Sequence, residues 1–526
     1  MNKITPAEKI AAPPGPTRAL LEVPSASILA AGPAACLREL YFQAREMGRL
    51  SKITFLELSQ EQYALGDYTE EISVELSKMV NDAAVRAVSI YTSCLDVLLQ
   101  TDFDSIIADV TNPRGVPILP FRRGPMVKRM ESPVENARTI GTELTGMNLP
   151  AATPASGAGQ SWVLPPLASD FTGAVSIRAR PAPERIVLTG GGCASCPRSQ
   201  DDLMGLDFSY ADIDDLDVSE GIEEAVADPS VAHAKDAGRR ELAFLGTPVT
   251  DTTGIDGSVL RRVATTDGLE AHFQATDGFH DAVKGWSDAE LDLLKRATPV
   301  LDDAPRSTVV LVGWSPFVFG RLERLHGAIE FLHRQGTELI VPGLACQEQL
   351  DAAAHANAVW IISGDGLPAA NWLSSTYDVP VFRGLPVGTT GWNHWVSRLI
   401  EYGAVPDEFG PLQCPLIDSS LSGVRTTVVV PEHPALAKAV CTMLKQDLGC
   451  SVSAVPISEL DQLRPDDGDV LIADPLILEQ RICDINNKIA LPYPLSSGNL
   501  FIDGPYEYIG EEGIKYFSQA ISSRTK

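Results

Sequence analysis

The stretch STVVLVGWSPFVFGRLERLHGAIEFLHRQGTELIVPG, residues 307–343, decides the fold class of this chain. It begins with an apolar run of strand length, continues at 321–336 with apolar residues at helical spacing, and closes that helix at Gly336. A second apolar run, 337–343, ends in Pro-Gly. Strand, helix and strand in this order predict a right-handed crossover between two parallel strands of one sheet.

The same alternation extends to both sides of this stretch. Upstream, strand-like runs at 25–33 and 52–59 flank a helical run at 34–48. Downstream, strands and helices alternate as far as residue 405, and again from Val424 to the last helix. The sequence therefore predicts an α/β fold with three doubly wound, Rossmann-like parallel-sheet domains and an inserted segment.

A chain of 526 residues is too long for one hydrophobic core, so several domains are expected. A segment rich in Pro, Ala, Gly and Ser without sustained periodicity is typical of a linker or a long surface loop. The expected parts are a disordered N-terminus at 1–20, a first α/β domain at 21–146, a linker or loop at 147–184, the inserted segment at 185–305, a second α/β domain at 306–405 and a third at 424–526.

Composition and charge exclude several classes of protein. The formal net charge is −27, which argues against a nucleic-acid partner because such partners need clustered Lys and Arg. No uninterrupted apolar run approaches the roughly 18 residues that cross a bilayer, and Pro and Glu interrupt the first twenty residues where a secretory signal needs a continuous apolar centre. Nine cysteines, an odd number scattered over the chain, do not suggest a disulfide framework. We therefore expect a cytoplasmic protein with reduced thiols and no membrane partner.

The segment RIVLTGGGCASCPRSQ, residues 185–200, runs a strand-like stretch into three glycines and then into Cys193 and Cys196. The two thiols lie within chelating reach of each other. A structural zinc site is disfavoured, because no second pair of Cys or His follows at short spacing and the next candidate ligand is His233. A thioredoxin-like redox couple, iron–sulfur ligation and a tight turn of small residues after a strand all remain open.

Several segments, in their order along the chain, resemble the component 1 family of nitrogenases. The first, AAGPAAC, is similar to the family's His-Gly-Pro-x-x-Cys, with Ala31 in place of the His. The resemblance covers roughly two thirds of the chain and implies a subunit built from three parallel-sheet domains. The segments are AAGPAAC (30–36), SIYTSCLDVLLQTDFDSI (89–106), VPILPFRRGP (116–125), the block from Ala358 to Tyr402, and FIDGPYEYIGEEGIKYFSQAI (501–521).

This resemblance implies that Cys36 and Cys94, each after a strand, are iron–sulfur ligands near a subunit interface. Cys193 and Cys196 lie in the segment that looks inserted relative to the family, and together with the first two they would make a set of four thiolates. Thiolate is a soft ligand for iron, and clusters are commonly held by four cysteines. The expected cofactor is therefore an iron–sulfur cluster, of the 4Fe-4S type, and these four cysteines are the expected metal-binding residues.

The chain departs from the family at the active-site cofactor. The strand end WIISGDG, 360–366, has no Cys where the catalytic nitrogenase subunit holds its cofactor, and PYPLSSGNLFIDGPY, 492–506, contains no His. The resemblance therefore implies a divergent, nitrogenase-like oxidoreductase subunit that takes part in electron transfer. A scaffold that assembles a metallocluster without turnover and a structural subunit without a cluster are the alternatives.

The implied partners follow from the same resemblance. The sequence lacks a P-loop of the form G-x-x-x-x-G-K-[ST], so ATP hydrolysis would belong to a nitrogenase reductase-like ATPase that delivers the electrons. The family also implies a paired assembly, a dimer or tetramer, with a second copy of the chain or with a related component 1 subunit.

Other polar residues are weaker candidates. Arg122, Arg123 and Arg383 follow strands, where they are either contacts for an anionic substrate or partner or ordinary surface charges. His394 lies between two tryptophans on a predicted helix, which is more typical of a packed residue than of a ligand. The hydroxyl-rich loop at 244–256 lines a pocket or forms an ordinary turn.

Overall fold

The computed structural model divides the chain into two compact units. Unit 1 comprises Met1–Ser176, Pro183–Asp201 and Leu206–Gly285, and unit 2 comprises Ile177–Ala182, Asp202–Gly205 and Trp286–Lys526. The residues that the structure describes are 3–6, 15–123, 132–151, 164–179, 183–189, 193–194, 197, 207–297, 307–407, 421–464, 468–480, 485, 487–501, 504 and 507–525.

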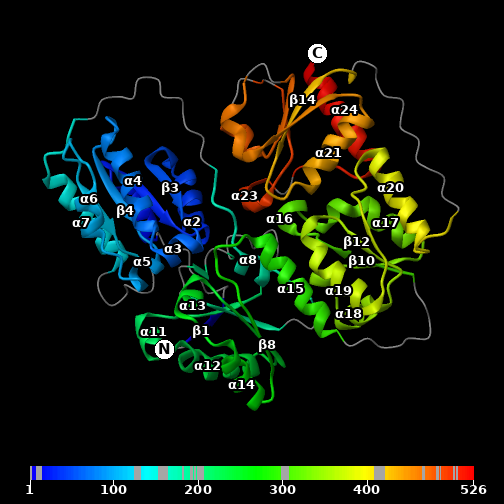
Figure 1. Cartoon of the computed structure of the whole chain (residues 1–526), viewed down its shortest axis with the longest axis horizontal. Coiled ribbons are helices and arrows are strands. Elements are labelled where there is room, and N and C mark those ends of the chain that lie inside the picture. The colour runs from blue at the N-terminus through cyan, green and yellow to red at the C-terminus, as the bar shows by residue number, and fades with distance from the viewer. Residues whose placement is uncertain are drawn as a thin grey trace. The chain divides into compact units, whose positions relative to one another are not determined.

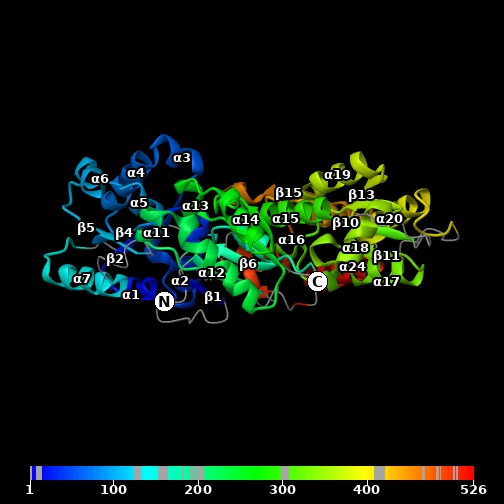
Figure 2. The same cartoon turned by 90° about the horizontal axis from the view of Figure 1, so that it is seen from below.

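The first sheet of unit 1 is parallel, with the strand order β3-β2-β4-β5. Helices cover both of its faces: α4 and α6 contribute to one apolar cluster, and α1, α2 and α7 to the other. Figure 2 shows α1 and α7 side by side. The strands are β2 (Ala26–Gly32), β3 (Ile53–Glu57), β4 (Ala87–Tyr91) and β5 (Ile118–Phe121). The helices are α1 (Pro16–Glu22), α2 (Ala34–Glu46), α3 (Gln60–Leu65), α4 (Tyr68–Asn81), α5 (Cys94–Leu98), α6 (Phe103–Asp109) and α7 (Pro133–Gly146).

The second sheet of unit 1 has five strands in the order β1-β7-β6-β8-β9. All of its pairs are parallel except that of β1 with β7. Its strands are β1 (Ile4–Pro6), β6 (Glu184–Leu188), β7 (Ser209–Ala211), β8 (Glu241–Leu245) and β9 (Glu270–Gln274). The accompanying helices are α8 (Asp170–Val175), α11 (Asp215–Glu220), α12 (Ile222–Asp236), α13 (Pro248–Thr253) and α14 (Gly257–Thr266). Helix α15 (Ala282–Arg296) runs from unit 1 into unit 2.

This second sheet differs from the sequence expectation in three respects. The segment 185–305, expected as an inserted segment, forms most of a further α/β layer. Residues 1–20, expected to be disordered, include β1 and α1, because β1 completes the edge of the sheet beside β7. The expected linker 147–184 contains α8, whose six residues are all buried.

Unit 2 contains two four-stranded parallel sheets of the same topology, β11-β10-β12-β13 and β15-β14-β16-β17 (Figure 1). The stretch 307–343 forms β10, α17 and β11, and β10 pairs with β11 in parallel, as its pattern predicts. The strands are β10 (Thr308–Val312), β11 (Glu338–Ile340), β12 (Ala358–Ile361), β13 (Val381–Arg383), β14 (Arg425–Val430), β15 (Ser451–Pro456), β16 (Val470–Ala473) and β17 (Lys488–Ala490). The helices are α16 (Pro316–Phe319), α17 (His326–Arg334), α18 (Gln347–Ala352), α19 (Leu367–Tyr377), α20 (Gly388–Glu401), α21 (Ala435–Gln446), α22 (Pro475–Glu479), α23 (Pro494–Ser497) and α24 (Gly510–Thr525).

In each sheet of unit 2 the first strand is central, with the second strand on one side of it and the third on the other. The predicted α/β class with Rossmann-like parallel sheets is therefore confirmed. Among the described helices, none combines the length and the apolar character that a bilayer crossing requires.

Candidate functional site

Cys36 lies in the first turn of α2, directly after the carboxyl end of β2. The turn between them contains Gly32, whose φ of +147° suits glycine. A Cβ on Gly32 would lie 3.2 Å from the Cβ of Ser93 and 3.8 Å from that of Cys36. The absence of a side chain at this position thus allows the ends of β2 and β4 to approach each other closely.

Cys94 is the first residue of α5, after the neighbouring strand β4. Ser93 caps this helix: the Asp96 backbone N–H donates to Ser93 Oγ at 3.3 Å, and the Ser93 N–H donates to Asp96 Oδ2 at 2.5 Å. The reciprocal cap fixes where the helix begins, and it therefore fixes the position of the thiol at the sheet edge.

Cys193 comes from the second sheet of unit 1, in a helical turn shortly after β6, and is half-buried. Cys94 packs in one apolar cluster with Ile186 and Leu188 of β6. The end of β6 is held by Thr247, whose hydroxyl donates to the Leu188 carbonyl at 2.8 Å. Helix α13, which follows Thr247, lies beside α5 (Figure 2). Two sheets of unit 1 therefore bring three strand ends together.

The structure brings Cys36, Cys94 and Cys193, which we call the thiol cluster, to one place. The Cys94 thiol donates a hydrogen bond to Cys193, and Cys36 is close enough for the charge of Cys193 to act on it. The fourth predicted ligand, Cys196, lies outside the described residues. Cys346, Cys441 and Cys450 are free thiols of unit 2.

Arg123 supplies a positive charge beside the thiol cluster. Its Nη2 donates to the Cys36 carbonyl at 2.8 Å and its Nε to the Thr92 carbonyl at 3.2 Å. The guanidinium carbon also lies 4.0 Å from the centre of the Tyr91 ring. These contacts fix the guanidinium on the loop after β5, next to the loops that carry Cys36 and Cys94.

The pKa values of the three thiols differ in direction. The hydrogen bond from Cys94 lowers the pKa of Cys193 to about 6, with further help from Thr189 and Arg123 against the effect of burial. The same hydrogen bond and burial raise the pKa of Cys94, and burial with the Cys193 charge raises the pKa of Cys36 to about 12. One thiolate facing one guanidinium is therefore the stable charge state of the metal-free cluster.

The three sulfurs of the thiol cluster are not spaced as three ligands of one metal ion. Two thiolates on one zinc ion, each about 2.3 Å from it, lie at most about 4.6 Å apart. In the described part of the chain, only Asp170, Asp277 and His280 bring three such donor atoms within 4.8 Å of one another, so the three sulfurs are spread more widely. An iron–sulfur cluster distributes its thiolates over different iron atoms and accepts a wider spacing.

Asp96 is a buried polar group of the same site that the sequence did not single out. Its side chain is 3 % exposed, and its Oδ1 has no hydrogen-bond partner in the described part of the structure. Burial raises the pKa of Asp96 to about 6, and its charge acts on Cys36. In the sequence, Asp96 is indicated only by its position two residues after Cys94, and that position is equally typical of a residue that caps a helix.

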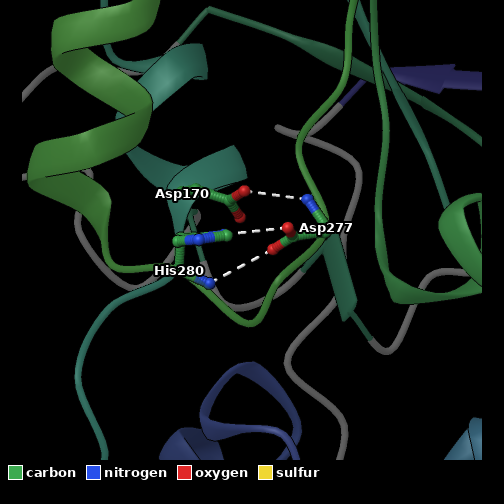
Figure 3. Close-up of side chains that lie close together, drawn as sticks. All are labelled: Asp170, Asp277 and His280. Carbon is green, nitrogen blue, oxygen red and sulfur yellow. Dashed lines mark hydrogen bonds and ion pairs between the residues drawn. The ribbon is translucent and has the colours of Figure 1, made fainter. Parts of the chain in front are cut away.

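Asp170, Asp277 and His280 form a second group that sequence reasoning missed (Figure 3). The buried Asp170 carboxylate accepts the backbone N–H groups of Asp277 and Gly278, each at 2.8 Å. Asp277 in turn accepts from His280 Nδ1 at 2.8 Å in the appropriate tautomer. Burial and the Asp277 charge raise the pKa of Asp170 to about 7. The carboxylate oxygens are occupied by the chain's own N–H groups, so the group acts as a clamp that ties α8 to the loop after β9.

The weaker candidates occupy different settings. Arg122 and Arg383 are exposed, and His394 is exposed on α20 rather than packed. The loop at 244–256 forms the buried cap of α13, in which Thr250 Oγ1 accepts the Thr247 N–H at 2.8 Å, so it is a turn after a strand.

No protein-family model matches this sequence, and no curated protein matches it. Among solved structures, nitrogenase Cp1 at pH 6.5 is similar over 70% of this chain and 94% of the Cp1 chain, with 12% identity and a TM-score of 0.50. Nitrogenase Cp1 at pH 5 matches 71% of this chain and 91% of its own, with 13% identity and a TM-score of 0.48. At this identity the likeness to the first structure concerns the fold. The chain therefore has a nitrogenase component 1-like fold, with three thiols gathered at strand ends of unit 1.

Proposed function

We propose that this chain is a nitrogenase-like component 1 subunit, an iron–sulfur oxidoreductase that receives electrons from an ATP-dependent reductase partner. The observation that supports it most is the convergence of Cys36, Cys94 and Cys193, which are far apart in sequence, beside the guanidinium of Arg123. The nitrogenase component 1-like fold supports the same proposal.

In this proposal Cys36, Cys94 and Cys193 hold a 4Fe-4S cluster, and Cys196 is the candidate for the fourth ligand. A bound cluster supplies a one-electron carrier. Arg123 offsets the negative charge of the thiolates, and its hydrogen bonds to the Thr92 and Cys36 carbonyls keep it in place. The apolar cluster around Cys94, including Leu188, limits water at the sulfurs, which tunes the potential of such a site.

The partners in this proposal are those that a nitrogenase component 1-like fold suggests. A second copy of the chain or a related component 1 subunit makes a dimer or tetramer, and a nitrogenase reductase-like ATPase delivers electrons at the expense of ATP. A cytoplasmic setting is part of the proposal, since it keeps the thiols reduced.

The first experiment measures cluster binding directly. The full chain is purified without oxygen, reconstituted with iron and sulfide, and analysed for iron, acid-labile sulfide and electron paramagnetic resonance after reduction. We expect about four irons per chain. Cys36→Ala, Cys94→Ala and Cys193→Ala should each lose most of the iron, whereas the unit 2 variants Cys346→Ala and Cys450→Ala should keep it. Full iron content in all three unit 1 variants would remove the site assignment.

The second experiment separates the redox role from the alternatives. Addition of a nitrogenase reductase and ATP should reduce the cluster, and its signal should appear only when both are present. Iron that binds but passes to an apo-acceptor protein without ATP-dependent reduction would favour the assembly scaffold. A wild-type chain that binds no iron after reconstitution would leave the structural subunit as the remaining function.

A further inference from the structure

The four sheets have eight outer strands in the described part of the chain, and these strands differ in how their free edges are protected. An outer strand presents unpaired backbone N–H and C=O groups along its free side, and another strand can pair with them. Proteins usually block such an edge with a charged side chain, with a proline or by keeping the strand short. Five of the eight outer strands contain a charged residue: Glu57 in β3, Glu270 in β9, Glu338 in β11, Arg383 in β13 and Lys488 in β17. Charge therefore protects most of these edges, but not those of β1, β5 and β15.

Strand β15 of unit 2 is the outer strand with the least protection. Strand β1 is only three residues long, and Pro120 occupies the interior of β5. Strand β15 has six residues, more than any other outer strand, contains no charged residue and has its proline only at the last position. All six residues pair in parallel with β14, so the strand is regular over its whole length. A long, regular and uncharged edge of this kind is suited to pairing with a further strand.

The residues of β15 are open to solvent. Four of the six are exposed, and only Val452 and Val455 are half-buried, whereas four of the six residues of the neighbouring β14 are buried. Helix α21 and the short 3₁₀ helix Ile457–Gln462 lie against β15. In the described part of the chain, β14 is the only strand that pairs with it. The outer side of β15 is therefore accessible to another strand.

The sequence of β15, Ser-Val-Ser-Ala-Val-Pro, is complementary to itself when two copies run antiparallel. Pairing about the centre of the strand places Val452 of one copy opposite Val455 of the other, and Ser453 opposite Ala454. Residues directly opposite each other lie on the same face of a sheet, and contacts between their side chains stabilise the pair. The small side chains at the centre let the two backbones approach without a clash. The edge of one copy therefore fits the same edge of a second copy.

The charge of the chain also favours a second copy at this edge. The formal net charge is −27, so two copies repel each other as they approach. Like charges directly opposite on paired strands are destabilising, and self-pairing at β9 or β11 would bring Glu270 or Glu338 of both copies together. Self-pairing at β15 brings no charged side chains of the two strands together. Two copies can therefore meet at β15 without this local repulsion.

We infer that β15 is the docking edge for a second copy of this chain, whose own β15 pairs with it in antiparallel direction. The pairing joins two four-stranded sheets into one sheet of eight strands. Because a twofold arrangement uses the same edge on both copies, it closes at two chains. The inference rests on the proposed function in that it gives a surface to its paired assembly. Strand β15 belongs to unit 2 and the thiol cluster to unit 1, so the two are tested separately.

The test measures the mass of the full, iron-free chain by analytical ultracentrifugation over a range of concentrations. At high concentration the wild type should have about twice the mass of one 56.4 kDa chain. The double variants Ser453→Glu with Ala454→Glu, and Ser453→Lys with Ala454→Lys, should each raise the dissociation constant at least about tenfold, because like charges then face each other. An equal mixture of the two variants should restore the doubled mass, because opposite charges then meet. The matched control, Ser375→Glu with Thr376→Glu at exposed positions of α19, should leave the mass unchanged.

A second measurement keeps the inference testable if the charged variants do not fold. A mixture of Ser453→Cys and Ala454→Cys chains should form a disulfide between these two positions of different chains, detected by peptide mass spectrometry after mild oxidation. The inference fails if the wild type remains a single chain at every concentration, if the charged variants keep the doubled mass, or if the mixed cysteine variants do not cross-link. Iron analysis distinguishes this result from a failure of the proposed function, because the β15 variants should take up iron as the wild type does.

Discussion

The thiol cluster of unit 1 and a small pocket of unit 2, whose walls include Val429, His433 and Ile477, occupy equivalent places in their sheets but offer opposite chemistry. Both lie at the carboxyl ends of parallel strands, beside the central strand of a sheet. The first gathers three sulfurs and a guanidinium, and the second has apolar walls with one oriented imidazole. The architecture therefore fixes where a site lies, and the few residues that follow each strand decide what the site can hold.

The two regions also treat buried titratable groups differently. In unit 1 the thiolate of Cys193 has Arg123 beside it. In unit 2 the carboxyl group of Glu290 is fully buried, and burial raises its pKa more than hydrogen bonds with the Gly313 backbone and Trp286 lower it. A charge is tolerated in the interior where a counter-charge is fixed in place, and elsewhere the group stays neutral.

The largest effect is expected at Gly32, and it tests whether close approach of strand ends makes the thiol cluster. Gly32→Val should strain a backbone with φ of +147° and press on Ser93 and Cys36. We expect a loss of stability of about 2–4 kcal/mol and loss of reconstituted iron. Gly364→Ala in unit 2, where a Cβ meets nothing within 4 Å, should be nearly neutral. Thermal unfolding and iron analysis of both variants check this, and equal behaviour of the two would contradict it.

The next largest effect is expected at Glu290, whose contribution to the free energy of unfolding depends on pH. Burial raises the pKa of Glu290 from 4.5 to about 8, so the folded chain keeps a proton that the unfolded chain releases. The stability that this proton contributes is complete below pH 4.5 and is lost as pH rises to about 8, at up to about 1.4 kcal/mol per pH unit. Glu290→Gln should therefore be more stable than the wild type at pH 8, by on the order of 2–4 kcal/mol, and nearly equal to it at pH 4.5. Thermal unfolding of both proteins across this pH range checks the prediction. A stability difference between Glu290→Gln and the wild type that does not vary with pH would contradict it.

A smaller effect is expected at Arg123 in the metal-free protein. Arg123→Met removes a positive charge that lowers the pKa of Cys193, so the thiol should titrate at higher pH. At pH 7 we expect the alkylation rate of Cys193 by iodoacetamide, followed by peptide mass spectrometry, to fall a few-fold. The rate at Cys450 serves as the internal control and should not change. An unaltered rate at Cys193 would show that the hydrogen bond from Cys94 alone sets its reactivity.

The smallest effect is expected at His280. It tests whether Asp170, Asp277 and His280 (Figure 3) have the structural role of tying α8 to the loop after β9. The His280 side chain is 55% exposed, so His280→Ala should cost at most about 0.5 kcal/mol. Asp170→Ala should cost about 2–3 kcal/mol, because the backbone N–H groups of Asp277 and Gly278 lose their buried acceptor. Chemical denaturation compares the two variants, and a larger loss at His280 would contradict the clamp.

The strand and helix order could be read from the sequence, but one sheet could not. The run at 307–343 is long, apolar and punctuated by glycine, so its pattern is plain. The second sheet of unit 1 relies on β1 and β7, each three residues long, and on β9, whose residues are exposed or half-buried. Such strands leave too short or too polar a pattern to be distinguished from loops.

Parts of the candidate sites were equally beyond the sequence. Cys36 and Cys94 follow strands and could be picked out by position. The approach of Cys193 to them depends on how two sheets pack, and the role of Arg123 depends on backbone carbonyls 31 and 87 residues away. His433 Nδ1 lies 3.1 Å from Asp365 Oδ1, although the two residues are 68 positions apart and belong to loops of different sheets, so nothing in either local pattern indicates the other.

Strand β1 has a consequence for how the chain matures on the ribosome. Its residues Ile4–Pro6 pair with Ser209–Ala211, so this strand is synthesised about 200 positions before its partner. At about 5–20 residues per second, this delay lasts on the order of 10–40 s. During that time the sheet that carries Cys193 is incomplete while Cys36 and Cys94 have already emerged, so the thiol cluster comes together late in the synthesis of unit 1.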